Sequence, residues 1–123
     1  DPVGPAEVLF QEQFYKNMFN TLTHDGIVIT QSESFLYHQD IIKNIASFSK
    51  KIFPRYFYSY TLVPTYPSGL IGFFFCSLNR KPLQDLDKER AKRLKNLKYY
   101  TPGIHRASFT LPKFAEEFFK GEP

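Results

Sequence analysis

The feature that most constrains the fold is the run LIGFFFCS, from Leu70 to Ser77, which is almost continuously apolar. A run of this length between turn residues is typical of a strand buried on both faces. It follows the loop Val63–Gly69 (VPTYPSG), in which two prolines and a glycine predict tight turns. The preceding segment, Tyr56–Val63, is rich in aromatic and β-branched residues, which favour a strand. The sequence therefore predicts a hairpin whose second strand must be covered on both sides.

A helix and a short strand are expected near the start of the chain. Phe14, Met18 and Leu22 fall four residues apart and predict an amphipathic helix, which Gly26 ends. Residues 26–31 (GIVITQ) form a β-branched run that fits a buried strand. The two prolines and the glycine ahead of the helix, in DPVGPAE, predict a shaped loop.

A second helix is expected between this strand and the hairpin. Its apolar face consists of Ile41, Ile42, Ile45, Phe48 and Ile52. Ser32 or Ser34 can cap its start, and Pro54 ends it. After the hairpin, the tail is expected to hold a short extended piece and then a terminal helix over Pro112–Lys120.

This order of elements predicts the fold class. Helix and strand alternate up to the hairpin, and the 123 residues suffice for one domain. We therefore expect an α/β fold, the second half of an open, mostly parallel sheet that ends in an antiparallel hairpin. Neither of the common glycine-rich phosphate loops occurs in the sequence.

The positive charge is concentrated in one segment. The net charge is +4, and Arg80–Lys98 holds eight Lys or Arg against three Asp or Glu. Nucleic-acid-binding stripes usually place aromatic side chains among the cations, but this segment has none before Tyr99. We interpret it as a solvated helix or loop and expect no nucleic-acid partner.

Cysteine and histidine usage limits the possible sites. A single cysteine, Cys76, excludes an internal disulfide and a cysteine-based zinc site, and its place in the apolar strand indicates an inert core thiol. His24, His38 and His105 have no metal-ligand spacing, so no metal is expected. There is no signal-like opening and no apolar run of about 18 residues, which favours a cytoplasmic protein without a membrane partner.

Polar side chains gather in three segments expected at the carboxyl ends of strands, where open α/β sheets bind ligands. They are Asp1 and Glu7 in the opening segment, Gln31 and Glu33 after the first strand, and Tyr66 in the hairpin loop. This set suits a small polycation, because carboxylates hold ammonium groups while an amide and a phenol orient them. A carboxylate beside a phenol can also take a proton from an amine.

Three of these residues also have an ordinary structural interpretation. Asp1 precedes Pro2 and can simply start a turn. Glu33 can be a carboxylate in the first turn of the second helix, stabilised by the helix dipole. Tyr66 can pack its ring and hydrogen-bond a backbone carbonyl. The residue pattern alone leaves both interpretations open.

Four motifs in a fixed order carry a more specific signal: DPVGPAE-x-LF, Q-x-E-S, PTYPSG-x-IGF-x-x-CS and LKYY-x-x-x-x-H-x-A-x-F-x-LP-x-F. Together they resemble the C-terminal half of the spermidine synthases, aminopropyltransferases that use decarboxylated S-adenosylmethionine. The resemblance extends from Asp1 to about Phe119. It implies that residues 1–123 form the C-terminal part of a Rossmann-like, methyltransferase-type catalytic domain. The nucleotide-binding half and the N-terminal β-domain of the family are not in this sequence.

The resemblance implies roles for four polar residues. Asp1 matches the second aspartate of the family's D-S-S-D signature, which holds an amine of putrescine. Gln31 and Glu33 match the pair that reaches the distal end of the diamine. Tyr66 matches the loop tyrosine that orients and deprotonates the attacking amine. Tyr66 and Asp1 are therefore the expected catalytic residues.

The resemblance also implies the donor site and the reaction. Pro5, Ala6 and Leu9 match part of the apolar wall beside the adenine and the methylthio group. The implied reaction moves an aminopropyl group from decarboxylated S-adenosylmethionine to putrescine and gives spermidine and methylthioadenosine. Decarboxylated S-adenosylmethionine is a co-substrate here, and no further cofactor is expected. The full-length enzyme is expected to be a homodimer.

Two departures from the family pattern keep alternatives open. The expected general base, the first signature aspartate, would precede Asp1, so we expect the isolated 123 residues to be inactive. The family's E-S-x-W-x-H reads ESFLYH here, with Leu36 at the tryptophan position, then Tyr37 and His38. This change leaves acceptor choice open. The alternatives are a spermine synthase, a putrescine N-methyltransferase, or a catalytically silent homologue that acts as an interaction subunit.

Overall fold

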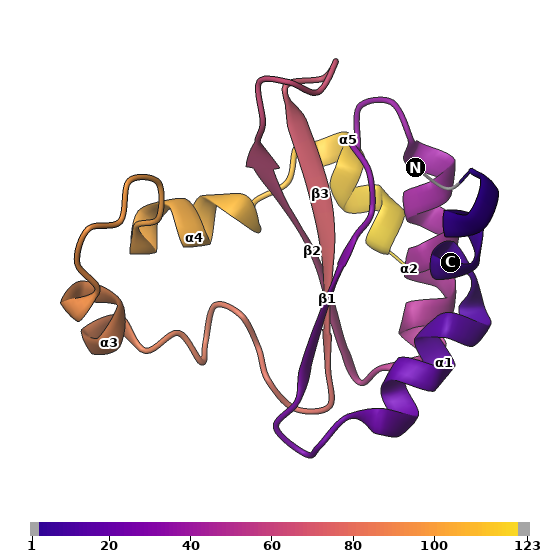
Figure 1. Ribbon diagram of the computed structural model, residues 1–123, viewed down its shortest axis with the longest axis horizontal. Helices are drawn as coiled ribbons and strands as arrows, with labels where there is room; N and C mark the ends of the chain where they lie inside the picture. The colour runs from indigo at the N-terminus through magenta and orange to yellow at the C-terminus, as the bar shows by residue number, and fades with distance from the viewer. Residues whose placement is uncertain (1–2, 121–123) are drawn as a thin grey trace.

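The computed structural model describes residues 3–120, which fold as helices around a three-stranded sheet (Figure 1). The elements, in chain order, are η1 (Gly4–Phe10), α1 (Glu12–Thr21), β1 (Ile27–Gln31), α2 (Gln39–Ile52), β2 (Arg55–Leu62), β3 (Leu70–Ser77), α3 (Lys88–Arg93), α4 (Pro102–Ser108), α5 (Lys113–Glu116) and η2 (Glu117–Phe119). The predicted hairpin is thus confirmed as β2 and β3.

The sheet has the strand order β1-β3-β2, and β3 pairs antiparallel with both neighbours. Val28 and Tyr56 both lie opposite Cys76, one on each side. Because β3 is antiparallel to both of them, β1 and β2 run in the same direction. The α/β class and the closing antiparallel hairpin agree with the prediction. The strand that closes the hairpin is inserted between the two parallel ones.

The central strand is buried as predicted, but β1 is not. On β3 every residue except Phe73 is buried, because sheet neighbours flank it and helices cover it. On β1 the exposed residues alternate with half-buried ones, and Ile29 is 55% exposed. The expectation of a buried first strand is therefore wrong in the described part of the chain. β1 is an edge strand there, and only its Val28 and Thr30 face is covered.

The core lies between one face of the sheet and the helices α1 and α2, with the C-terminal segment completing the layer. In Figure 1, α1 and α2 lie on one side of the sheet, and α3 and α4 on the other. The core cluster consists of Tyr15, Phe35, Ile42, Ile45, Ala46, Phe48, Phe53, Tyr58, Leu70, Phe74, Cys76 and Ala115. Many of its aromatic rings meet edge to face, for example Tyr15 with Phe48 at 4.8 Å between centroids. This core fixes the sheet on which the candidate site is built.

Local sequence signals predict some helix ends and miss others. α2 stops at Ile52, before Pro54, as predicted. Its N-cap is His38, without a side-chain capping bond, so the predicted caps Ser32 and Ser34 are wrong. The side-chain oxygen of Ser34 instead accepts a hydrogen bond from the Leu36 amide within the preceding loop.

Two segments gain helical structure that the sequence did not predict. Residues 4–10 form the 3-10 helix η1, where a loop was expected. Proline tolerates the first turn of a helix because its missing N–H would be unpaired there anyway. The same reasoning explains α4, which starts at Pro102 and is capped by the Thr101 side chain. The terminal helix was predicted and is present as α5 and η2.

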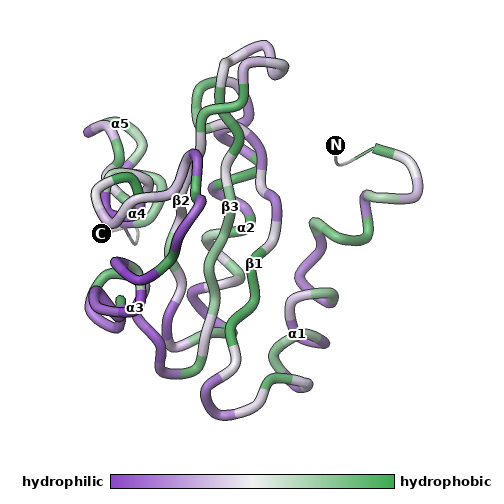
Figure 2. Tube along the Cα trace, turned by 60° about the vertical axis from the view of Figure 1, so that its left-hand side comes forward, coloured by the Kyte–Doolittle hydropathy of each residue, from purple (hydrophilic) through white to green (hydrophobic). Residues whose placement is uncertain are grey.

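The basic segment is largely solvated, as predicted. Of α3, only Ala91 is buried, and its lysines and arginines are exposed. Figure 2 shows this hydrophilic stretch at the side of the molecule, away from α1. Within residues 3–120, no helix has both the length and the apolar character that a membrane crossing requires.

Candidate active site

Two loops lie at the same end of the sheet. The β1–α2 loop, residues 32–38, follows the carboxyl end of β1, and the hairpin tip, residues 63–69, follows the carboxyl end of β2. Figure 1 shows both at the same end, next to the start of α2. The Ser32 amide donates to the Gly72 carbonyl at 2.9 Å, so the first loop begins alongside the strand that leaves the tip. This is the end at which the sequence predicted the site.

The hairpin tip consists of two consecutive turns. The Tyr66 amide donates to the Val63 carbonyl at 3.1 Å, and the Gly69 amide donates to the Tyr66 carbonyl at 2.8 Å. Pro64 and Pro67 occupy the second position of each turn, where their fixed φ is favourable. Gly69 has a φ of +71°, which glycine adopts without strain.

Tyr66 lies at the junction of these two turns. Its side chain is 38% exposed, and within residues 3–120 its hydroxyl makes no hydrogen bond. The alternative interpretation, a packed ring bonded to a backbone carbonyl, therefore does not hold in the described structure. The two turns present a phenol at the rim of the sheet.

In contrast to the exposed Tyr66, Glu33 is buried inside the protein. It is only 3% exposed, and its φ of +64° is uncommon for a residue with a side chain. Oε2 of its carboxylate lies 3.6 Å from Nδ1 of His38. α2 starts six residues later, at Gln39, and the acid in its first turn is Asp40. The interpretation of Glu33 as an ordinary helix-start carboxylate is thus wrong.

The backbone of Glu33 is hydrogen-bonded to Tyr58. The Tyr58 hydroxyl, on β2, donates a hydrogen bond of 2.7 Å to the Glu33 carbonyl oxygen across β3. It crosses β3 at Gly72, where a Cβ would collide with both the hydroxyl and that carbonyl. Burial raises the pKa of Tyr58, so the phenol stays protonated and able to donate.

Sequence reasoning missed this contact. The sequence pattern predicts Tyr58 only as a strand-forming aromatic residue within Tyr56–Val63. The available signal was Gly72, since a glycine inside an apolar strand often marks a close approach of another group.

The other predicted residues have different settings. Gln31 is the last residue of β1 and is exposed, two positions before Glu33 in the chain. Pro5, Ala6 and Leu9 all lie on η1, which in both views stands apart from the hairpin tip (Figures 1 and 2). Asp1 lies outside the described residues.

His105 and the cysteine have structural contacts in the described part of the chain. His105 bridges Tyr100 and the Pro82 carbonyl, at 3.2 and 2.8 Å. Cys76 is fully buried, and burial raises the pKa of its thiol to about 12. Among residues 3–120, no three or more His, Cys, Asp or Glu gather closely enough to hold a metal ion.

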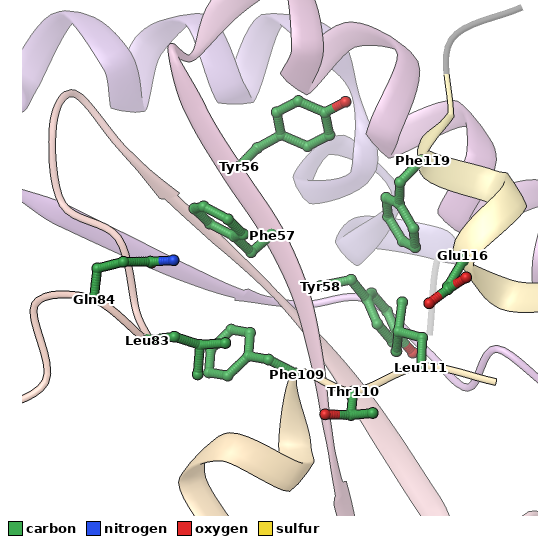
Figure 3. Close-up of a pocket in the computed structure, with 10 residues that line it drawn as sticks. All are labelled: Tyr56, Phe57, Tyr58, Leu83, Gln84, Phe109, Thr110, Leu111, Glu116 and Phe119. Carbon is green, nitrogen blue, oxygen red and sulfur yellow. The ribbon is translucent and has the colours of Figure 1, made fainter. Parts of the chain in front are cut away.

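A hollow of about 540 Å³ lies elsewhere, along the outer edge of β2 (Figure 3). Its lining includes Tyr56, Gln84, Phe109, Glu116 and Phe119. Tyr58 takes part in that lining, but Gln31, Glu33 and Tyr66 do not. The candidate site is therefore separate from this hollow.

The chemistry available at the sheet end is that of an amine site. A buried carboxylate attracts an ammonium group more strongly than a solvated one, because the surrounding dielectric is lower. Glu33 supplies that carboxylate, Gln31 an accessible amide, and Tyr66 a phenol on a stiff loop. An amine held between the first two can be oriented by the third.

Comparisons with known proteins show the family of this chain. The family model described as "Spermine/spermidine synthase domain" matches residues 1–88. The polyamine aminopropyltransferase of Leptospira biflexa is 51% identical over 120 residues, which are 98% of this chain and 42% of that protein. The spermidine synthase of Dictyostelium discoideum is 40% identical over 118 residues, covering 94% and 40% of the two chains.

Solved structures show the same relationship. The spermidine synthase of Thermotoga maritima superposes with a TM-score of 0.86 at 32% identity, over 97% of this chain and 41% of that one. A spermidine synthase solved in complex with the transition state analogue AdoDATO gives a TM-score of 0.89 at 33% identity, over the same shares. The chain spans about two fifths of the length of these relatives. On this evidence, the chain belongs to the spermine/spermidine synthase domain family.

Proposed function

We propose that the protein to which this chain belongs is a spermidine synthase, which transfers an aminopropyl group from decarboxylated S-adenosylmethionine to putrescine. The observation that carries the proposal is the placement of Glu33 and the Tyr66 loop at the same end of the sheet, in a chain of this family. The relatives named aminopropyltransferase or spermidine synthase support it.

The proposed step is an in-line displacement at carbon. The lone pair of a neutral putrescine amine forms a C–N bond to the carbon next to the sulfonium sulfur. The C–S bond breaks, its electron pair stays on sulfur, and neutral methylthioadenosine leaves. The amine proton passes to a base, for which the resemblance suggests the signature aspartates with Tyr66. Holding both reactants in line can supply about 7–11 kcal/mol of the barrier reduction.

Electrostatics explain why the site needs carboxylates. The acceptor is a diammonium ion and the donor a sulfonium, so two cations must approach one another. A buried carboxylate offsets this repulsion, and it is most effective where water is excluded. We assign that task to Glu33 for the distal ammonium, with Gln31 beside it and Asp1 at the reacting end. Pro5, Ala6 and Leu9 remain proposed for the donor's apolar wall.

The wider setting belongs to the same proposal. We propose a cytoplasmic homodimer that acts on small molecules, with no nucleic-acid or membrane partner and no cofactor besides the co-substrate. A related enzyme remains the alternative, because Leu36 and Tyr37, where the family pattern changes, are both exposed next to buried Glu33. They could admit another acceptor.

The test uses the full-length protein and mass spectrometry of the products. Putrescine is offered with decarboxylated S-adenosylmethionine in one reaction and with S-adenosylmethionine in another. Spermidine in the first reaction is the expected result. N-methylputrescine in the second would move the protein to the methyltransferases, and spermine from added spermidine would indicate a spermine synthase. No product from any mixture would favour a catalytically silent homologue.

A further inference from the structure

Tyr58 spans the sheet beneath the candidate site. Its ring starts on β2, passes over β3 at Gly72 and ends at the Glu33 carbonyl, which it meets at 2.7 Å. Neighbouring strands lie about 4.8 Å apart, so the side chain and its hydrogen bond together bridge about two strand spacings. Only glycine at position 72 leaves room for this path.

The ring of Tyr58 is fixed on several sides. It is 3% exposed and lies 6.3 Å from the Phe35 ring, 5.6 Å from Phe74 and 5.6 Å from Phe119, measured between centroids. Figure 3 shows it with Phe119 and Leu111 of the C-terminal segment. A donor locked in this way holds its acceptor in one place.

The backbone of Glu33, whose carbonyl accepts this hydrogen bond, has a conformation that needs support from a neighbouring group. Glu33 has a φ of +64°, a conformation that costs free energy for a residue with a Cβ and persists only where the surroundings enforce it. The Tyr58 bond fixes the carbonyl end of this residue, and the buried Phe35 follows two positions later. Rotation of the Glu33 backbone would swing the carboxylate away from its position 3.6 Å from His38.

From these contacts we infer that Tyr58 is a positioning residue, which sets the direction of the Glu33 carboxylate at the acceptor site through the Glu33 backbone. The inference rests on the proposed function for its effect on catalysis. Its structural part, the restraint of residues 32–38, stands without that function. Tyr58 touches no substrate in this scheme and acts only through Glu33.

The test compares Tyr58→Phe with Tyr60→Phe in the full-length protein. Both changes remove one hydroxyl from the same face of β2, and both rings lie against Phe35. Tyr58→Phe should raise the KM for putrescine about tenfold, the loss expected for one hydrogen bond, and leave the KM for the donor unchanged. Tyr60→Phe should change neither. A purely structural role would lower the melting temperature without this split between the two substrates.

Amide hydrogen exchange provides a readout that does not depend on the reaction. Tyr58→Phe should speed exchange about tenfold at the Tyr37 and His38 amides, which bond to the Ser34 carbonyl, and not in β1 or α1. If the unmodified protein makes no spermidine, the proposed function fails and exchange alone decides the inference. Unchanged exchange in residues 32–38, or equal changes in both variants, would overturn it.

Discussion

The two loops at the candidate site hold their key residues by different means. The hairpin tip is organised locally, because its two turns bond within residues 63–69 and each contains a proline. The β1–α2 loop makes a long-range contact, because the Glu33 carbonyl accepts a hydrogen bond from Tyr58, 25 residues further along the chain. One loop offers an exposed phenol and the other a buried carboxylate. The comparison shows that a rim site can combine a locally rigid part with a part held by the core.

The largest expected effect comes from Gly72→Ala, which disrupts the long-range contact between Tyr58 and Glu33. The new Cβ would collide with the Tyr58 hydroxyl and the Glu33 carbonyl, a rigid backbone atom. We expect a loss of about 3 kcal/mol in the free energy of unfolding, measured in urea on the full-length protein.

Gly69→Ala, in the hairpin tip, is the matched control. It meets no atom within 4 Å, but its φ of +71° is strained for alanine, at about 1–2 kcal/mol. Equal losses in the two variants would mean that the crossing at Gly72 has no special role.

Tyr66→Phe tests the local loop by its chemistry. The change removes only an exposed hydroxyl, so the free energy of unfolding should move by less than about 0.5 kcal/mol. Turnover of putrescine should fall about 100-fold or more, the usual contribution of a group that helps to move a proton. Tyr56→Phe, at the other end of the hairpin's first strand, is the control and should keep full turnover. A Tyr66→Phe enzyme with normal turnover would remove Tyr66 from the mechanism.

The same contrast explains what the sequence could predict. The hairpin, the buried central strand and the exposure of Tyr66 follow from local signals, namely two prolines, a glycine and an apolar run. The burial of Glu33 and the start of α2 do not follow from local signals. The predicted serine caps were wrong because Ser34 is used within the loop, and Glu33 is six residues from the helix start. The path of Tyr58 over Gly72, a contact between distant parts of the chain, contributes to that geometry.

The exposed face of β1 was also beyond local prediction. A β-branched run such as GIVITQ fits a strand, but burial depends on what covers it. Only one face of β1 packs against α1 in the described residues, where the Tyr15 hydroxyl and the Thr30 Oγ1 lie 2.7 Å apart. The roles of all the predicted site residues stay predictions from resemblance: Asp1, Pro5, Ala6, Leu9, Gln31, Glu33 and Tyr66.

Glu33→Gln tests whether the negative charge of the buried carboxylate is needed to bind putrescine. The amide keeps the size of the carboxylate and loses the negative charge that would hold an ammonium group. We expect the KM for putrescine to rise about tenfold, with kcat and the KM for the donor little changed, because binding is lost in ground state and transition state alike. Glu116→Gln, an exposed carboxylate on α5, should have no effect. An unchanged KM in Glu33→Gln would make Glu33 a structural residue.

The smallest effect is expected from Pro64→Ala, which loosens the local loop without removing a contact. Alanine gives the unfolded chain more freedom, so the free energy of unfolding should fall by about 0.4–1 kcal/mol. The bond from the Tyr66 amide to the Val63 carbonyl does not involve the proline ring, so the turn should persist. Turnover should therefore fall far less than in Tyr66→Phe. If turnover fell as far as in Tyr66→Phe, the stiffness of the loop would matter as much as the phenol. The main role of the hairpin tip would then be to fix the position of Tyr66.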